Sequence, residues 1–174
     1  ETDEGKIITV FSTKGGVGKT MLTTNLAVAL AEKFAVKVAI VDCDLQFGDI
    51  SICLNVMPKA SIVDMVTDIE HLDENVLSRY MVSFSDKLHV LPAPFQPEDA
   101  EKVTSKHLAS VFKLLKKQYQ FIVVDTAPIF SDATLASVDF ADLILVVTAP
   151  DLTTTKNVKL CLETLETLGY AQEK

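Results

Sequence analysis

The chain has 174 residues, of which 48% are hydrophobic and 23% charged, and 16 Lys and Arg against 24 Asp and Glu give a formal net charge of −8. This is the composition of one globular domain with a single core, which excludes a disordered chain. The acidic excess disfavours a nucleic-acid surface made by the bulk charge, and no apolar run approaches the roughly 18 residues that a transmembrane helix needs.

Five short apolar runs predict β-strands. Most are rich in Val and Ile and nearly continuous rather than alternating, which is typical of strands buried on both faces of a parallel sheet. The runs span residues 7–12, 36–42, 88–92, 121–125 and 143–148.

Helical periodicity lies between these runs. Apolar residues recur at intervals of three and four positions in three segments, and residues 61–67 and 73–81 have the pattern of shorter helices. Alternating strands and helices predict an α/β fold, a three-layer sandwich around a mostly parallel sheet. The three apolar faces consist of Leu22, Leu26, Leu30 and Phe34, of Leu108, Val111, Phe112 and Leu115, and of Val158, Cys161, Leu162 and Leu165.

The two ends of the chain suggest the domain boundaries. Residues 1–5 are acidic, end in glycine and lack an initial Met, so we interpret them as a linker remnant ahead of a domain over residues 6–174. The last helical pattern ends at Gly169, a residue typical of the position after a helix C-cap. A strand usually follows such a helix in an α/β fold, so we expect a C-terminally truncated domain that lacks its last strand and helix.

The three cysteines indicate the compartment. Cys43, Cys53 and Cys161 form no CxxC pair, so they predict neither a disulfide framework nor a zinc or iron–sulfur site. They favour a reducing, cytoplasmic location. The three histidines share no spacing and have no cysteine neighbours, so we interpret them as structural or surface residues.

The most informative segment is K-G-G-V-G-K-T over residues 14–20, directly between the first predicted strand and the first predicted helix. This is the context of a phosphate-binding loop, in which glycines let backbone amides approach phosphate oxygens and the following helix presents its N-terminus to them. Lys19 can reach the β- and γ-phosphates, and the Thr20 hydroxyl can bind Mg²⁺. The predicted nucleotide-binding residues are Gly15, Gly16, Val17, Gly18, Lys19, Thr20 and Met21.

The loop departs from the usual G-x-x-x-x-G-K-[ST] pattern, because Thr13 replaces the first glycine and Lys14 precedes the others. This variant resembles the deviant Walker A motif of the ParA/MinD family, a SIMIBI-type group of P-loop NTPases. The resemblance implies an ATPase whose two protomers enclose two ATP molecules, with Lys14 of each protomer reaching the nucleotide of the other. A solvated loop lysine is the alternative.

Carboxylates follow two of the predicted strands. Asp42 and Asp44 end the second strand, and Asp125 ends the fourth in a Walker B pattern of four apolar residues and an aspartate. Ligands of open α/β sheets bind at the carboxyl ends of the strands, where an acidic residue can hold Mg²⁺ directly or through water. The family resemblance implies that Asp44 positions or activates the attacking water and that Asp42 lies nearer the outer shell of the metal. With ATP and Mg²⁺ as ligands, the predicted catalytic residues are Lys14, Lys19, Asp44 and Asp42, and the metal-binding residues are Thr20, Asp125 and Asp42.

Several shorter segments resemble the CpaE/TadZ group of pilus-assembly and localisation ATPases within that family, over about residues 6 to 170. The resemblance implies a switch protein that dimerises around ATP, hydrolyses it slowly with stimulation by a partner, and positions a cell-envelope machine such as a type IV or Flp pilus. Its place would be the cytoplasm, at the inner face of the membrane or a cell pole. The segments include D-L-Q-F-G-D (44–49), S-I-V-D (61–64), L-P-A-P (91–94), S-D-A-T-L (131–135) and P-D-L (150–152).

Other functions remain open. A hydrolysis-poor, ATP-bound scaffold would use the same loop. A ParA-type partition ATPase that coats DNA is disfavoured by the net charge of −8, and an iron–sulfur carrier on this fold would need paired cysteines.

Lys113, Lys116 and Lys117 predict a solvated helix face, with a patch for an acidic partner or nucleic acid as the alternative. The expected partners are a second copy of the chain and pilus or secretion proteins, with no nucleic acid favoured and membrane association indirect or unknown.

Overall fold

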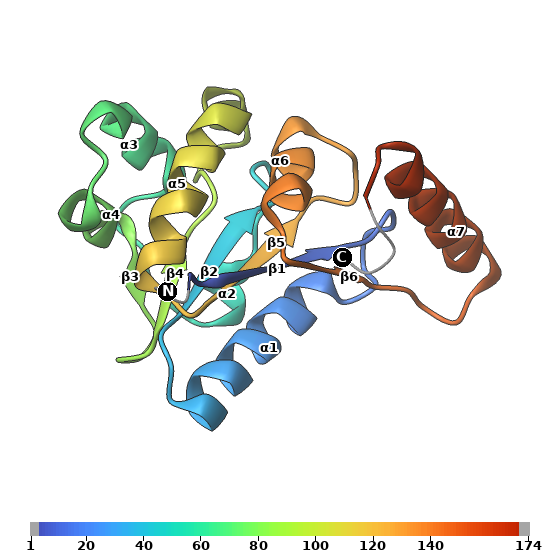
Figure 1. Cartoon of the computed structure of the whole chain (residues 1–174), viewed down its shortest axis with the longest axis horizontal. Helices are drawn as coiled ribbons and strands as arrows, with labels where there is room; N and C mark the ends of the chain where they lie inside the picture. The colour runs from blue at the N-terminus through green and yellow to red at the C-terminus, as the bar shows by residue number, and fades with distance from the viewer. Residues whose placement is uncertain (1–3, 171–174) are drawn as a thin grey trace.

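A six-stranded sheet forms the middle layer of the molecule. The computed structural model of the chain describes residues 4–170, and the strand order within them is β3-β4-β2-β5-β1-β6 (Figure 1). Every neighbouring pair is parallel except β3 and β4. The strands are β1 (Lys6–Phe11), β2 (Val38–Cys43), β3 (Val82–Ser83), β4 (Leu88–Leu91), β5 (Phe121–Thr126) and β6 (Leu143–Val146).

The five predicted strands are confirmed, with bounds that shift by at most two residues. The Val- and Ile-rich runs form the central strands because helices cover both faces of the sheet. The antiparallel β3 was not predicted, since two residues carry no periodicity. It pairs Val82 with Val90 of β4. The predicted α/β sandwich with a mostly parallel sheet is the observed fold.

Helix α1 (Lys19–Phe34) covers one face of the sheet, the lower one in Figure 1. It packs against the strands with small side chains, which lets its backbone approach the sheet. The predicted apolar face of this helix is therefore wrong at its ends, where Leu22 is 39% and Phe34 is 57% exposed. Besides Lys19, the buried residues of α1 are Thr23, Thr24, Ala27 and Ala31.

Helices α5 (Ser105–Gln118) and α6 (Asp132–Phe140) cover the other face, and α3 (Ile62–Thr67) and α4 (Glu74–Tyr80) pack beside them (Figure 1). The two short helices expected at 61–67 and 73–81 are thus confirmed. So is the apolar face of α5, because all four of its predicted core residues are buried: Leu108, Val111, Phe112 and Leu115.

Four short elements were not predicted: α6, α2 (Ile50–Cys53), and the 3-10 helices η1 (Ile69–His71) and η2 (Pro97–Lys102). Three of them are too short to show a helical period. The fourth, α6, buries mostly small residues, so its apolar pattern is weak. Its buried residues are Ala133, Thr134, Ala136, Ser137 and Val138.

β6 lies at one edge of the sheet that residues 4–170 form, and it is only partly buried there. An edge strand has a single neighbour, here β1, and Leu143 is 42% exposed. Helix α7 (Leu152–Thr167) packs at this edge, where Cys161 and Leu165 join Phe11 in a small core cluster.

The end of α7 is as predicted from the sequence. Gly169 has a φ of 89°, and its amide donates to the carbonyl of Glu166 at 2.9 Å. The amide of Tyr170 donates to the carbonyl of Leu165 at 3.0 Å. These two bonds complete a Schellman motif, which favours glycine because of the positive φ.

The residue before β1 is hydrogen-bonded to α5. The amide of Gly5 donates to the carbonyl of Lys116 at 2.8 Å, and a Cβ on Gly5 would lie 1.9 Å from the carbonyl oxygen of Tyr119. Of the predicted linker, residues 1–3 lie outside the described residues, as do 171–174 at the other end. Within residues 4–170, no helix combines the length and apolarity that crossing a membrane requires.

Candidate functional site

The predicted phosphate-binding loop connects β1 to α1 at the carboxyl ends of the parallel strands. Gly16 and Gly18 have φ values of 74° and 96°, which L side chains rarely adopt. A Cβ at Gly15, Gly16 or Gly18 would contact nothing within 4 Å, so the space above the loop is open. Gly18 is the N-cap of α1 and supplies no side-chain hydrogen bond. The first amides of α1 therefore stay available to an anion, which the helix dipole also favours.

Two polar side chains of the loop fit a phosphate ligand. Lys19 is buried, with 8% of its surface exposed. Thr13, which replaces the first glycine of the usual motif, has a buried Oγ1 that finds no hydrogen-bond partner within residues 4–170. A buried ammonium and an unpaired hydroxyl are both satisfied by phosphate oxygens. Met21 is 68% exposed, so its side chain does not line the loop and its backbone amide is the group that can contact a ligand.

Asp125 is the centre of the hydrogen bonds beside this loop. It lies in β5, one residue before the strand ends, and is 1% exposed. Oγ1 of Thr20 donates to its Oδ2 at 2.5 Å, and Oγ1 of Thr23 donates to its Oδ1 at 3.3 Å. Burial raises the pKa of Asp125, while the two hydroxyls and the charge of Lys19 oppose this shift. The structure thus brings together three predicted residues, Lys19, Thr20 and Asp125, and adds Thr23, which the sequence did not single out.

Asp42 lies opposite Asp125 in the register of β2 and β5 and is also 1% exposed. Burial, and then the negative charge of Asp125, raise the pKa of Asp42 well above its usual range. Its Oδ1 accepts from the amide of Asp44 and its Oδ2 from the amide of Ile50, both at 3.2 Å. A Cβ on Gly48 would lie 2.4 Å from Oδ2 of Asp42. The loop after β2 therefore closes tightly over this carboxylate and is held by it.

Asp44 is the first residue after β2 and is only partly buried. Its Oδ1 accepts from the amide of Phe47 at 3.3 Å. Burial raises the pKa of Asp44, and the Phe47 amide and the positive charge of Lys19 partly oppose that shift. Asp44 therefore borders the phosphate loop as an accessible carboxylate with increased basicity, whereas Asp42 is enclosed.

The oxygen atoms around Asp125 fit Mg²⁺. The Thr20 hydroxyl and the carboxylates of Asp125 and Asp42 are the hard ligands that this cation prefers. A divalent cation would also relieve the repulsion that raises the pKa of Asp42. Across residues 4–170, no three His, Cys, Asp or Glu side chains group into a site of their own for a metal ion. The residues present suit a cation that binds together with nucleotide phosphates and water.

Lys14 has its polar contacts outside this cluster. Its Nζ lies 3.3 Å from both carboxylate oxygens of Asp151 and 3.3 Å from Oγ1 of Thr153. Asp151 is the N-cap of α7 and accepts from the amide of Thr154 at 2.9 Å. The hydroxyls of Thr153 and Thr154 and the Thr154 amide hold the pKa of Asp151 below its usual range, with a smaller contribution from Lys14. In the single chain, Lys14 is thus separated from the other predicted catalytic residues, and Asp151 is a partner that the sequence did not reveal.

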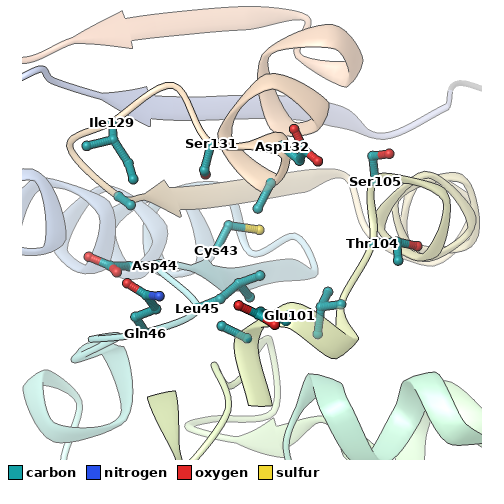
Figure 2. A pocket seen from close by; sticks show the side chains of 14 residues that line it. Cys43, Asp44, Leu45, Gln46, Glu101, Thr104, Ser105, Ile129, Ser131 and Asp132 are labelled. Atoms are coloured by element: carbon teal, nitrogen blue, oxygen red, sulfur yellow. The ribbon is translucent and has the colours of Figure 1, made fainter. Parts of the chain in front are cut away.

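A cavity of about 420 Å³ borders Asp44 on the side away from α1. Figure 2 shows it between the loop after β2 and the loop after β5, with the start of α5 at its far end. The loop after β2, which carries Asp44, and the loop after β5, the strand that carries Asp125, therefore both border this open space. Side chains labelled around the cavity include Cys43, Asp44, Gln46, Glu101, Thr104, Ile129, Ser131 and Asp132.

The comparison with known proteins gives one family. A family model described as an AAA domain matches residues 5–174. The chain belongs to this family. The septum site-determining protein MinD of Thermotoga maritima is 30% identical over 172 residues, which make up 98% of this chain and 62% of that protein. The chain spans about three fifths of the length of the curated MinD relatives that it matches, 62% for Thermotoga maritima and 60% for Bacillus subtilis.

Solved structures agree with this family. MinD of Pyrococcus horikoshii, complexed with Mg-ADP, superposes with a TM-score of 0.79 and 28% identity over 96% of this chain and 67% of that one. A ParA family ATPase from Chlorobium tepidum shares the fold, with a TM-score of 0.91 and 21% identity over 98% of this chain and 71% of that one. The predicted α/β fold is therefore the fold of these MinD and ParA proteins.

Asp125→Asn is expected to stabilise the chain in the absence of nucleotide. The pKa of Asp125 is raised in the folded state, so its charge destabilises the fold progressively as the pH rises above 3.8, the usual pKa of the group. The gain in Tm should grow as the pH rises and should vanish at pH values below the usual pKa, where the carboxyl is neutral in both states.

Thermal unfolding without Mg²⁺ over a pH series measures this gain. Asp86→Asn, at an exposed position, is the control and should leave Tm unchanged within about 1 °C. A lower Tm for Asp125→Asn at every pH would contradict the destabilising effect of the buried charge.

Proposed function

We propose that the chain is the ATP-binding and ATP-hydrolysing part of a switch protein that dimerises around ATP. The contrast between its two loop lysines carries this proposal. Lys19 is buried beside Thr20 and Asp125, whereas the Lys14 ammonium lies outside the site, 3.3 Å from Asp151. In this proposal Lys19 binds the chain's own nucleotide and Lys14 binds a nucleotide held by a second protomer. The Mg-ADP in the similar MinD of Pyrococcus horikoshii supports an adenine nucleotide with Mg²⁺ as the ligand.

Nucleotide binding would use the loop and the first turn of α1. The backbone amides of residues 15–21 and the Lys19 ammonium neutralise phosphate charge in the open space above the glycines. Mg²⁺, when bound, neutralises charge on the β- and γ-phosphates and makes the γ-phosphorus more electrophilic. Thr20 and Asp125 would hold this cation, and Asp42 would add its charge to the outer shell while it fixes the loop that carries Asp44.

Hydrolysis would use Asp44 as the group that orients water and accepts its proton. Its raised pKa makes it a better base than an ordinary carboxylate. The water oxygen bonds to the γ-phosphorus, the bond from that phosphorus to the bridging oxygen breaks, and ADP leaves with the electron pair. The proton passes through Asp44 to the released phosphate. Lys19 and the Lys14 of a second protomer stabilise the negative charge that develops on the phosphate oxygens.

On dimerisation, Lys14 would leave its contacts within the chain and bind the phosphates held by the second protomer. In the single chain, Asp151 and Thr153 hold the ammonium. The side chains of Lys14 and Asp151 are 42% and 41% exposed, so the pair is weak and screened by water. The pair therefore favours the monomer slightly, and it can open when a triphosphate is presented to Lys14.

We propose the positioning of a cell-envelope machine such as a pilus as the output of the switch. The resemblance of several segments to pilus-assembly ATPases supports this output, and Phe47, 72% exposed in one of these segments, would contact the partner. Septum-site determination, the role named for the MinD relatives, is the second candidate and is favoured by the 30% identity with one of them. A partition ATPase that coats DNA is disfavoured by the net charge of −8.

The solution mass with Mg·ATP and with Mg·ADP tests the switch. Light scattering after gel filtration should find a dimer with ATP and a monomer with ADP. Lys14→Ala should lose hydrolysis, because its ammonium no longer reaches the partner's phosphates, while Lys113→Ala on the exposed side of α5 should behave as the unchanged chain. The same mass with both nucleotides, together with unchanged turnover in Lys14→Ala, would refute the trans role of Lys14.

Asp44→Asn tests the catalytic carboxylate. Turnover should fall by about 10²–10⁴-fold, because an amide cannot accept the proton of the attacking water. ATP affinity should stay within about threefold, since Asp44 carries no phosphate contact in this mechanism. Asp49→Asn in the same loop is the control, and a fluorescent ATP analogue and phosphate release give the two measurements. Equal turnover in Asp44→Asn and the unchanged chain would favour the hydrolysis-poor scaffold.

Asp151→Asn tests whether the ion pair between Lys14 and Asp151 opposes dimerisation. The asparagine oxygen can still accept from the Thr154 amide, so α7 keeps its N-cap while the ion pair is lost. The ATP concentration at which half of the chains dimerise should fall by about two- to fivefold, as expected for an exposed pair. A requirement for more ATP would show that Asp151 supports the dimer instead, and unchanged helicity by circular dichroism verifies the cap.

A further inference from the structure

A second polar cavity lies at the end of the sheet opposite the phosphate loop. Its volume is about 300 Å³, at the small end of the range for pockets that bind small molecules. β2 runs from Val38, next to this cavity, to Cys43, next to Asp44, so roughly 17 Å of strand separates the two sites. The residues that line it, here called the His89 cavity, are Lys37, Glu74, His89, Lys117, Gln118 and Tyr119.

The topology of the sheet brings these residues together. Lys37 precedes β2, and His89 lies in β4, which pairs with β2. The imidazole of His89 packs edge-on against the ring of Tyr119, with 5.7 Å between centroids and 68° between planes. Tyr119 caps the C-terminus of α5, so Lys117 and Gln118 reach the same cavity from the last turn of that helix. The wall therefore combines β4, the residue before β2, the end of α5 and, through Glu74, the start of α4.

Two buried polar atoms of this wall are unpaired. Nδ1 of His89 and Nε2 of Gln118 have no hydrogen-bond partner within residues 4–170. The third such atom in the described chain is Oγ1 of Thr13 in the phosphate loop. Buried polar groups without partners are rare in native proteins, and each calls for a ligand, an ion or an ordered water. Both residues line the cavity, so a ligand bound there would lie beside the side chains that carry these atoms.

The charges around the cavity favour an anion as that acceptor. Lys37 and Lys117 contribute two positive charges against one negative charge from Glu74. Neither lysine is among the ion pairs found in the described part of the chain, whereas their neighbour Lys116 pairs with Asp142 at 3.2 Å. A lysine in the last turn of a helix also complements the helix dipole. That effect accounts for Lys117, but it leaves the unpaired imidazole and amide nitrogens without a role.

We propose that the His89 cavity binds a small oxyanion, a phosphate or a carboxylate, between Lys37, Lys117, the Gln118 amide and the His89 imidazole. A carboxylate or phosphate oxygen accepts from amide and imidazole N–H groups and from ammonium groups, and charge-assisted bonds of this kind are the stronger ones. The site lies apart from the nucleotide and is independent of the proposed ATPase function.

The protonation of His89 gives a local signal of binding. Burial and the charge of Lys37 lower the pKa of His89, and Asp86 opposes this shift. Lys117 and Glu74 face the same cavity, and burial raises the pKa of Tyr119 to about 12, so that phenol stays neutral. A bound anion adds a negative charge beside the imidazole. The midpoint of the His89 ring titration should therefore move to higher pH when the cavity is filled.

The experiment is an NMR titration of the full chain with inorganic phosphate, and with acetate in a second arm, at constant ionic strength set by chloride. Mg·ADP is present to occupy the phosphate loop, and the ring signal is assigned by its loss in His89→Gln. Phosphate or acetate should shift the His89 ring signal saturably, and the stronger of the two identifies the anion class. The double variant K37Q/K117Q should weaken that affinity by about tenfold or more, and Lys113→Gln, on the same helix outside the cavity, should not change it.

Three results would overturn the proposal. The His89 ring could fail to respond to either anion, which would leave an ordered water as the partner of the two nitrogens. The response could fail to saturate, which would show general charge screening. The control Lys113→Gln could weaken the affinity as much as K37Q/K117Q, which would show a diffuse effect of net charge. None of these results depends on ATP turnover, so they are distinguishable from a failure of the proposed ATPase function.

Discussion

The pairing of β2 with β5 sets two aspartates side by side where water is excluded. Asp42 and Asp125 are register partners, each 1% exposed, and burial raises both pKa values. Enclosing two carboxylates is unfavourable unless other groups compensate. Here the Thr20 and Thr23 hydroxyls bond to one, and the amides of the loop after β2 bond to the other. This compensation is incomplete, because hydroxyls and amides carry no full positive charge. A cation that binds with a nucleotide would compensate the remaining negative charge of the two carboxylates. Nucleotide binding would therefore stabilise this part of the sheet.

The same constraint explains how α1 packs. For Thr20 and Thr23 to reach Asp125, the first turns of this helix have to lie close to β5. Small side chains at Ala27 and Ala31 allow that approach, and they are buried. The larger apolar residues at the ends of the helix, Leu22 and Phe34, are consequently turned to the surface. The position of the carboxylate therefore accounts for the exposure at the two ends of the apolar face, while Leu26 and Leu30 in its middle still pack against the core.

The parts that could be predicted from the sequence are those that depend on neighbouring residues. The loop K-G-G-V-G-K-T, the strands that flank it and the apolar face of α5 all carry local patterns. The contact of Thr23 with Asp125 joins residues 102 positions apart, and that of Lys14 with Asp151 joins residues 137 apart. Such contacts form only when the sheet has assembled, so no local sequence pattern predicts them.

A parallel sheet also gathers residues at its amino edge, and this follows from the same topology as the nucleotide site. Because five of the six strands within residues 4–170 run in one direction, the segments that precede them meet at one edge, as those that follow them meet at the other. Lys37 before β2 and the last turn of α5 before β5 meet there in the way that Asp44 and the loop after β5 meet at the carboxyl edge. Helix termini give the two edges opposite partial charges, positive where α1 begins and negative where α5 ends. The lysines at the end of α5 offset the negative partial charge of that helix end. An anion at the amino edge therefore needs further hydrogen-bond donors. The proposed oxyanion site draws such donors from the Gln118 amide and the His89 imidazole.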